Sequence, residues 1–142
     1  MSSERAVRAV LKATAKRSVK ASNKVLSQAK RIQAKLTAMN VQLQRGDFVS
    51  AKEAKALSTQ VESWYRSLVA EYGRRFSSEP SVKESVLHSQ TIRENADMMV
   101  YDTQRIVNGN GNPATRQKYF VNLMVAAANN FIQSFNRVQN QS

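Results

Sequence analysis

The chain has 142 residues, with 22 Lys and Arg against 10 Asp and Glu, and therefore a formal net charge of +12; it contains one His and no Cys. The lack of Cys excludes disulfide frameworks, thiolate zinc sites and cysteine nucleophiles. Only four Gly and two Pro occur, which favours an almost wholly helical protein. No apolar run approaches the roughly 20 residues needed to span a bilayer, and the 42% of hydrophobic residues are enough for the core of one domain.

Residues 1–46 form a basic segment in which Glu4 is the only acidic residue. Half of the chain's cations lie here, at Arg5, Arg8, Lys12, Lys16, Arg17, Lys20, Lys24, Lys30, Arg31, Lys35 and Arg45. At about 100° of rotation per helical residue, those up to Lys35 gather on one side, opposite a side rich in Val, Leu, Ala and Ser. The pattern predicts one amphipathic helix that ends at Gly46, a residue type common just after a helix C-terminus.

This basic helix is expected to project in part as an arm. About 40 helical residues reach roughly 60 Å at 1.5 Å per residue, which exceeds the width of a small domain. The Ala- and Ser-rich apolar side suits close packing against another helix. Within 1–46 the stretch after Glu4 has no acidic residue to pair with its cations, so an anionic partner is expected to supply the missing charge.

A second helix is predicted to begin after residues 47–49. Ser50 and Glu53 have the spacing of a capping box, and apolar residues then recur every three or four positions from Ala54 to Tyr72. The pattern fades after Arg74-Arg75-Phe76, so the helix is expected to end near there.

Two more helices complete the chain. Pro80 and a second capping box, Ser81–Glu84, are expected to open a third helix that runs to about Ile106. The segment 108–113 has the strongest loop signals, with Asn112 as N-cap and Pro113 as the first residue of a fourth helix.

The expected fold is all-α, with a long basic N-terminal helical arm (residues 1–46) followed by an antiparallel helix bundle (residues 47–142). All ten aromatic residues lie at or after Phe48. The core is therefore expected within 48–140, where three helices, with or without the end of the first, form the bundle, and the basic helix is expected to be a poorer contributor to the core.

The sequence contains no residue set that favours catalysis, and we expect no enzyme activity, cofactor, metal or small-molecule substrate. Glu84 and His88 share a helix face, but a di-iron site of the ferritin type needs a second His. Gly109 and Gly111 lack the Lys-Ser/Thr of a phosphate loop. These residues are interpreted as a surface histidine and a turn.

The basic segment favours binding of nucleic acid. Residues 1–47 contain no Phe, Tyr or Trp, the side chains on which single-strand binders stack bases. Contact with the phosphates of double-stranded DNA is therefore expected, through the eleven cations of residues 1–46, without sequence specificity and with strong salt dependence. Amide side chains of the segment can add hydrogen bonds, namely Asn23, Gln28, Gln33, Asn40, Gln42 and Gln44.

The chain is small and is expected to be all-helical, with a basic helical arm from Arg5 through Arg45 and a C-terminal bundle from Ser50 through Val138. In this combination it resembles the major capsid proteins of filamentous archaeal viruses, the rudivirus, lipothrixvirus and tristromavirus group. The resemblance implies a virion protein whose arms wrap double-stranded DNA, hold it in the A-form and assemble with further copies or a paralogous subunit into a helical filament. Phosphate clamping is then implied for Arg8, Lys12, Lys16, Lys20, Lys24, Lys30, Arg31 and Lys35.

Two alternatives stay open. The chain can be a cytoplasmic, nucleoid-associated or internal phage protein that condenses duplex DNA without forming a regular coat. It can also be an adaptor whose basic helix docks on an acidic protein or an anionic membrane surface. A membrane is the less favoured partner, because the apolar side has mostly Ala, Val and Ser where interfacial helices place Trp, Phe or many Leu.

Overall fold

The computed structural model describes residues 2–107 and 113–140, and the side chains of 19–105 and 115–140. This part of the chain folds into four α-helices, with a short 3-10 turn η1 (Gly73–Arg75) after the second. The helices are α1 (Ser2–Gln44), α2 (Ala51–Tyr72), α3 (Pro80–Val107) and α4 (Pro113–Asn140). The described residues contain no strand, so the predicted all-α class is confirmed.

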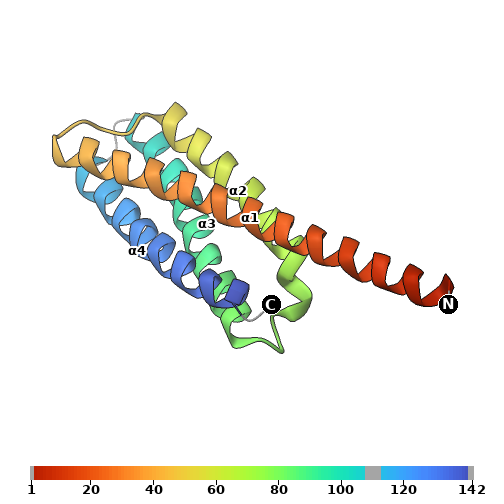
Figure 1. Ribbon diagram of the computed structural model, residues 1–142. Coiled ribbons are helices and arrows are strands. Elements are labelled where there is room, and N and C mark those ends of the chain that lie inside the picture. The colour runs from red at the N-terminus through yellow and green to blue at the C-terminus, as the bar shows by residue number, and fades with distance from the viewer. Residues whose placement is uncertain (1, 108–112, 141–142) are drawn as a thin grey trace.

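Successive helices run antiparallel and enclose a single core. α1 packs against α2 and α4, and α3 packs against the same two helices, so the four helices form a closed ring in cross-section. Figure 1 shows that the C-terminal half of α1 lies within this bundle, whereas its N-terminal part extends past the ends of the other helices.

The sequence signals at the first connection are confirmed. Gly46 has a φ of 85°, which places it in the left-handed region where a residue after a helix end is usually glycine. Ser50 caps α2, because its Oγ accepts a hydrogen bond from the Glu53 backbone N–H at 3.1 Å. Ser50 Oγ also lies 3.3 Å from Glu53 Oε1, so the two side chains of the capping box meet directly.

The start of α3 differs from the prediction. The helix begins at Pro80, and the Lys83 N–H bonds to the carbonyl of Glu79, so Ser81 lies inside the first turn and does not cap it. Ser81 is buried against the core. α4 begins at Pro113 as predicted, whereas the expected N-cap Asn112 and the loop before it lie outside the described residues.

Aromatic side chains from α2 and α4 fill the centre of the bundle. Trp64 and Phe131 meet edge to face with centroids 4.8 Å apart, and Phe135 lies between Phe131 and Tyr72, at 5.3 Å from each. All four side chains are buried. Edge-to-face and offset pairs of this kind add about 0.5–1.5 kcal/mol each beyond the burial of area.

α1 is a full member of this core. The structure thus settles the place left open for the end of the first helix, and the expectation that the basic helix is a poorer contributor is wrong. Among its described side chains, those of residues 19–44, six apolar ones are buried, at Val25, Ala29, Ile32, Leu36, Met39 and Leu43. The indole N–H of Trp64 donates to the Val25 carbonyl at 3.1 Å and so ties α2 to the α1 backbone. The smaller side chains of α1 complement the large aromatic residues of its neighbours, so its lack of aromatic residues does not keep it out of the core.

Two buried polar groups fix how the helices meet. The amide of Gln117 on α4 accepts a hydrogen bond from the Val49 N–H at 3.0 Å and donates to the Val49 carbonyl at 2.8 Å, which docks the α1–α2 connection on the bundle. Between α3 and α4, the hydroxyls of Ser85 and Ser134 are 2.9 Å apart and both are fully enclosed. These small side chains allow the two helices to approach closely.

Candidate nucleic-acid interface

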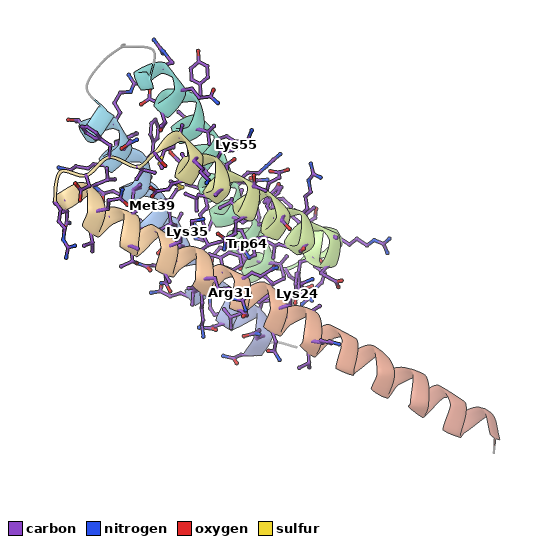
Figure 2. All side chains as sticks on the ribbon, turned by 90° about the horizontal axis from the view of Figure 1, so that it is seen from above. Lys24, Arg31, Lys35, Met39, Lys55 and Trp64 are labelled. Carbon is purple, nitrogen blue, oxygen red and sulfur yellow. The ribbon has the colours of Figure 1, made fainter. Side chains whose placement is uncertain are left out.

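The outer face of α1 carries a row of cations because its opposite face is buried. Val25, Ile32 and Leu36 point into the core, and the helical period then directs the intervening Lys and Arg residues toward solvent. Lys20, Lys24, Lys30 and Arg31 are exposed and Lys35 is half-buried. Figure 2 marks Lys24, Arg31 and Lys35 along this helix. From Lys20 to Lys35 the row extends about 22 Å at 1.5 Å per residue.

The positive charge of this face is not compensated within the described part of the chain. Five arginines of the other elements pair with carboxylates: Arg66 and Arg93 with Glu62, Arg75 with Glu79, Arg116 with Asp102 and Arg137 with Glu84. Among residues whose side chains are described, the α1 cations and Arg45 form no ion pair. Four carboxylates, Glu62, Glu79, Glu84 and Asp102, are thus held by arginines of α2, η1, α3 and α4, and among the described side chains none pairs with a cation of α1.

The carboxyl pKa values reflect this division. The hydrogen bond from Arg93 lowers the pKa of Glu62 below its ordinary value of 4.5, with a further contribution from Arg66. The hydrogen bond from Arg75 similarly lowers the pKa of Glu79. Both carboxylates are therefore held more firmly in the ionised form by their arginines, and neither pairs with a cation of α1 among the described side chains.

A shallow depression of about 480 Å³ lies beside two cations of the face. Asn23, Ser27, Ala34 and the partly buried Leu26 line it together with Lys30 and Arg31. The depression is open to solvent and lies on the outer side of α1, where a bulky ligand can approach the helix surface. Short side chains beside two long cationic ones suit contact with a polyanion backbone, because the ammonium and guanidinium groups can reach around it.

The structure places six of the eleven predicted site residues. Lys20, Lys24, Lys30, Arg31 and Lys35 lie on one helix, and Arg45 is exposed just after its end. The side chains of the other five lie outside the described residues, at Arg5, Arg8, Lys12, Lys16 and Arg17, although their backbone belongs to α1.

Two of the amides predicted to assist binding are used inside the protein. Gln33 Nε2 donates to Asn129 Oδ1 on α4 at 2.6 Å, and Gln42 Nε2 donates to the Phe48 carbonyl at 2.8 Å. These two amides could have added hydrogen bonds to a ligand, but in the structure they bond to other parts of the chain. Asn23 and Gln44 are exposed and stay available.

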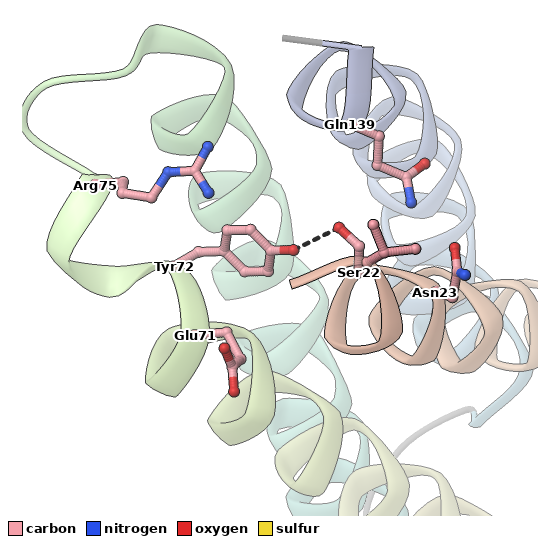
Figure 3. A pocket seen from close by; sticks show the side chains of 7 residues that line it. Ser22, Asn23, Glu71, Tyr72, Arg75 and Gln139 are labelled. Carbon is pink, nitrogen blue, oxygen red and sulfur yellow. Dashed lines mark hydrogen bonds between the residues drawn. The ribbon is translucent and has the colours of Figure 1, made fainter. Parts of the chain in front are cut away.

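A polar cleft that the sequence did not indicate lies where α1 leaves the bundle. It has a volume of about 320 Å³ and is lined by Val19, Ser22, Asn23, Glu71, Tyr72, Arg75 and Gln139. Figure 3 shows the Tyr72 hydroxyl reaching Ser22, and the two oxygens are 2.6 Å apart. Arg75 is bound by Glu79, and Glu71 points away from the hydroxyl pair, so charged groups do not converge here.

Other kinds of site find no support in the described residues. They contain no cluster of three or more His, Cys, Asp or Glu placed to hold a metal ion. The Glu84 carboxylate is taken by Arg137, so the Glu84–His88 pair is not free for a ligand. None of the helices is long and apolar enough, over the residues described, to cross a membrane.

Comparisons with protein families, with curated proteins and with solved structures found no match for this chain.

Proposed function

We propose that the chain is a structural protein that binds double-stranded DNA through the outer face of α1 and coats or condenses it without reading its sequence. The observation that carries the proposal is the row of cations on α1 with no ion-pair partner among the described side chains. Duplex DNA presents one negative charge per about 1.7 Å of its axis. About 22 Å of duplex therefore carries roughly 13 phosphates on its two strands, more than the number of cations in the row, so the phosphates on the facing side alone can occupy them.

The absence of aromatic residues from α1 favours duplex over single-stranded nucleic acid. Residues 2–44 contain no Phe, Tyr or Trp on which an unpaired base could stack. Lys and Arg contact phosphates irrespective of the bases, so we expect binding to be non-specific.

We further propose that the N-terminal part of α1 acts as a basic arm, in which Arg5, Arg8, Lys12, Lys16 and Arg17 continue the cationic face beyond the bundle. In the most specific form of the proposal, the arms of several copies line one duplex and the bundles form the outside of a helical virion filament. This is the arrangement that the resemblance to filamentous archaeal virus capsid proteins implies. A-form DNA is expected inside, because a dry, positive lining relieves the repulsion between phosphates drawn together across its deep groove.

The test is a salt titration of duplex binding with variants of the intact chain. Removing residues 1–46 would also remove six core side chains, so neutralising substitutions are the cleaner change. The variant Lys24→Gln/Lys30→Gln/Arg31→Gln is compared with Lys52→Gln/Lys55→Gln/Lys118→Gln, which loses the same three charges from exposed positions on α2 and α4.

For the first variant, the plot of log K against log salt is expected to be less steep by about 2.7. Each of the three lost cations leaves one phosphate without neutralisation, and each neutralised phosphate contributes about 0.9 to the steepness. The matched control should change the slope much less. Equal changes in both variants would show that net charge, not the α1 face, governs binding. No binding of wild type even at low salt would favour an acidic protein or anionic lipid as the partner.

Two further measurements separate the forms of the proposal. Regular filaments with duplex DNA in electron micrographs would support a coat, whereas irregular aggregates would support a nucleoid-associated or internal phage protein. A B-form circular dichroism spectrum of the saturated complex would contradict the A-form part and leave DNA coating intact.

A further inference from the structure

α3 has a second packing stripe on its exposed side. Glu94, Met98, Tyr101 and Arg105 follow one another at intervals of four, three and four residues, the spacing of a helix–helix seam. Met98 is 52% exposed and Tyr101 is 64% exposed. The opposite side of α3 already packs in the core, so this stripe is free to meet a surface outside the chain.

The exposed apolar surface continues onto α4. Arg116 Nε donates to Asp102 Oδ1 at 2.9 Å, so this side of α4 faces α3. Tyr119 and Leu123 lie three and seven residues further along and therefore share that side of the helix. They are 62% and 38% exposed. Large exposed apolar side chains thus lie on the adjacent sides of both helices, as is typical of an interaction surface.

The two charged residues of the α3 stripe lack partners in the monomer. Glu94 and Arg105 are eleven residues apart, which is about 16 Å along a helix and too far for a bond between them. Within the described side chains neither forms an ion pair, and Arg105 lies only over the ring of Tyr101, at 5.8 Å. Each charge is therefore available to an opposite charge from another molecule.

The stripe is complementary to itself when reversed. The pair Met98 and Tyr101 and the pair Glu94 and Arg105 have the same midpoint along α3. If a second copy of α3 packs antiparallel about that midpoint, Met98 of each copy meets Tyr101 of the other, and Glu94 of each meets Arg105 of the other. A two-fold interface requires this self-complementarity, in which residue i contacts j and j contacts i.

We propose that this stripe is the two-fold interface of a homodimer, in which two copies pack antiparallel through α3 and are flanked by Tyr119 and Leu123. A nucleic acid does not fit the same surface, because Glu94 and Arg105 cancel and the residues between them are apolar. The α1 cations lie on a different helix, so the dimer leaves them accessible. The inference is independent of DNA binding and is tested without DNA.

The experiment measures the mass of the full chain by sedimentation equilibrium, at about 0.15 M salt and again at about 1 M, where repulsion between the cationic subunits is screened. Wild type is expected at twice the 15.9 kDa of one chain. Glu94→Arg and Arg105→Glu should each raise the dissociation constant at least about tenfold at the lower salt, because each places like charges opposite one another twice.

The double variant Glu94→Arg/Arg105→Glu restores opposite charges and should dimerise like wild type, whereas the control Glu71→Arg on α2 should not affect the mass. Because the chain has no Cys, introduced cysteines give a direct test of register. Oxidising a mixture of Glu94→Cys and Arg105→Cys chains should yield linked dimers. Either chain alone should not, because its cysteines lie about 16 Å apart along the seam, beyond disulfide reach. A monomeric wild type at both salts, or failure of the double variant to recover, would overturn the proposal.

Discussion

Replacing Gln117 by leucine tests how the α1–α2 connection is held. The amide of Gln117 serves both the N–H and the carbonyl of Val49 and also donates to Thr103 Oγ1 at 3.3 Å. Gln117 and Val49 are each 1% exposed, so water has no ready access to the groups that leucine leaves unpaired. Leucine has a similar size, so the variant removes hydrogen bonds and leaves the packed volume nearly unchanged.

At about 1 to 3 kcal/mol for each buried group without a partner, the two backbone groups of Val49 predict a loss of about 2 to 6 kcal/mol in the free energy of unfolding. Urea unfolding followed by far-ultraviolet circular dichroism measures this loss as a lower midpoint at an unchanged slope. Gln133→Leu, at an exposed position of the same helix, is the matched control and should stay within about 0.5 kcal/mol of wild type. A loss below about 1 kcal/mol for Gln117→Leu would refute the prediction that the hydrogen bonds of this amide hold the α1–α2 connection on the bundle.

Two more predictions concern the backbone and the charges. Gly46→Ala should lower the free energy of unfolding by about 1 to 2 kcal/mol, because a φ of 85° is unfavourable for alanine. The cost comes from the backbone alone, since the added Cβ would meet no atom within 4 Å. An unchanged thermal midpoint would contradict this prediction. The lowered pKa of Glu62 means that its ion pairs stabilise the fold above about pH 4.5 and lose this effect as the pH falls through the folded-state pKa. Glu62→Gln should therefore lower the urea midpoint at pH 7, and the midpoint of this variant should fall less than that of wild type as the pH drops below 4.5. If the midpoints of variant and wild type fall equally in that range, the ion pairs of Glu62 do not cause the fall.

The helix ends could be predicted because each depends on local chemistry. Gly46, Ser50 and Pro113 act through their own backbone conformation or through a side chain three residues away, and all three stand where the sequence places them. Ser81 failed as a cap because Pro80 already begins the helix, which commits the next residues to its first turn. Two helix-start signals thus stand at adjacent positions, and the helix begins at the proline.

The place of α1 in the core could not be predicted from its composition. The stripe of Val25, Ile32 and Leu36 is visible in the sequence, but the number of aromatic residues favoured the other three helices as the source of the core. Whether small side chains are buried depends on what lies opposite them, and Trp64 comes close only after the chain has turned back. The hydrogen bonds between Gln117 and Val49 leave no periodic pattern in the sequence, since they join residues 68 positions apart.

The candidate face itself followed from helical periodicity, because burial of one side of α1 fixes what the other side presents. The absence of ion pairs on this face, among the described side chains, could not be predicted from the sequence. It depends on which carboxylates the arginines of α2, η1, α3 and α4 reach in the folded chain. Glu62, for example, binds Arg93 across 31 residues of sequence.

Because α1 provides both buried core residues and the exposed cations, binding of a polyanion to its outer face would be thermodynamically linked to folding. A polyanion that binds the ordered row of cations more tightly than it binds the unfolded chain would add this difference in binding free energy to the stability of the fold. At a free ligand concentration 100 times its Kd, the gain would reach at most about 2.7 kcal/mol, the value for a ligand with no affinity for the unfolded chain. The melting temperature should therefore rise with polyanion concentration and fall back as salt releases the ligand, so that thermal stability itself becomes a measure of how fully the face is occupied.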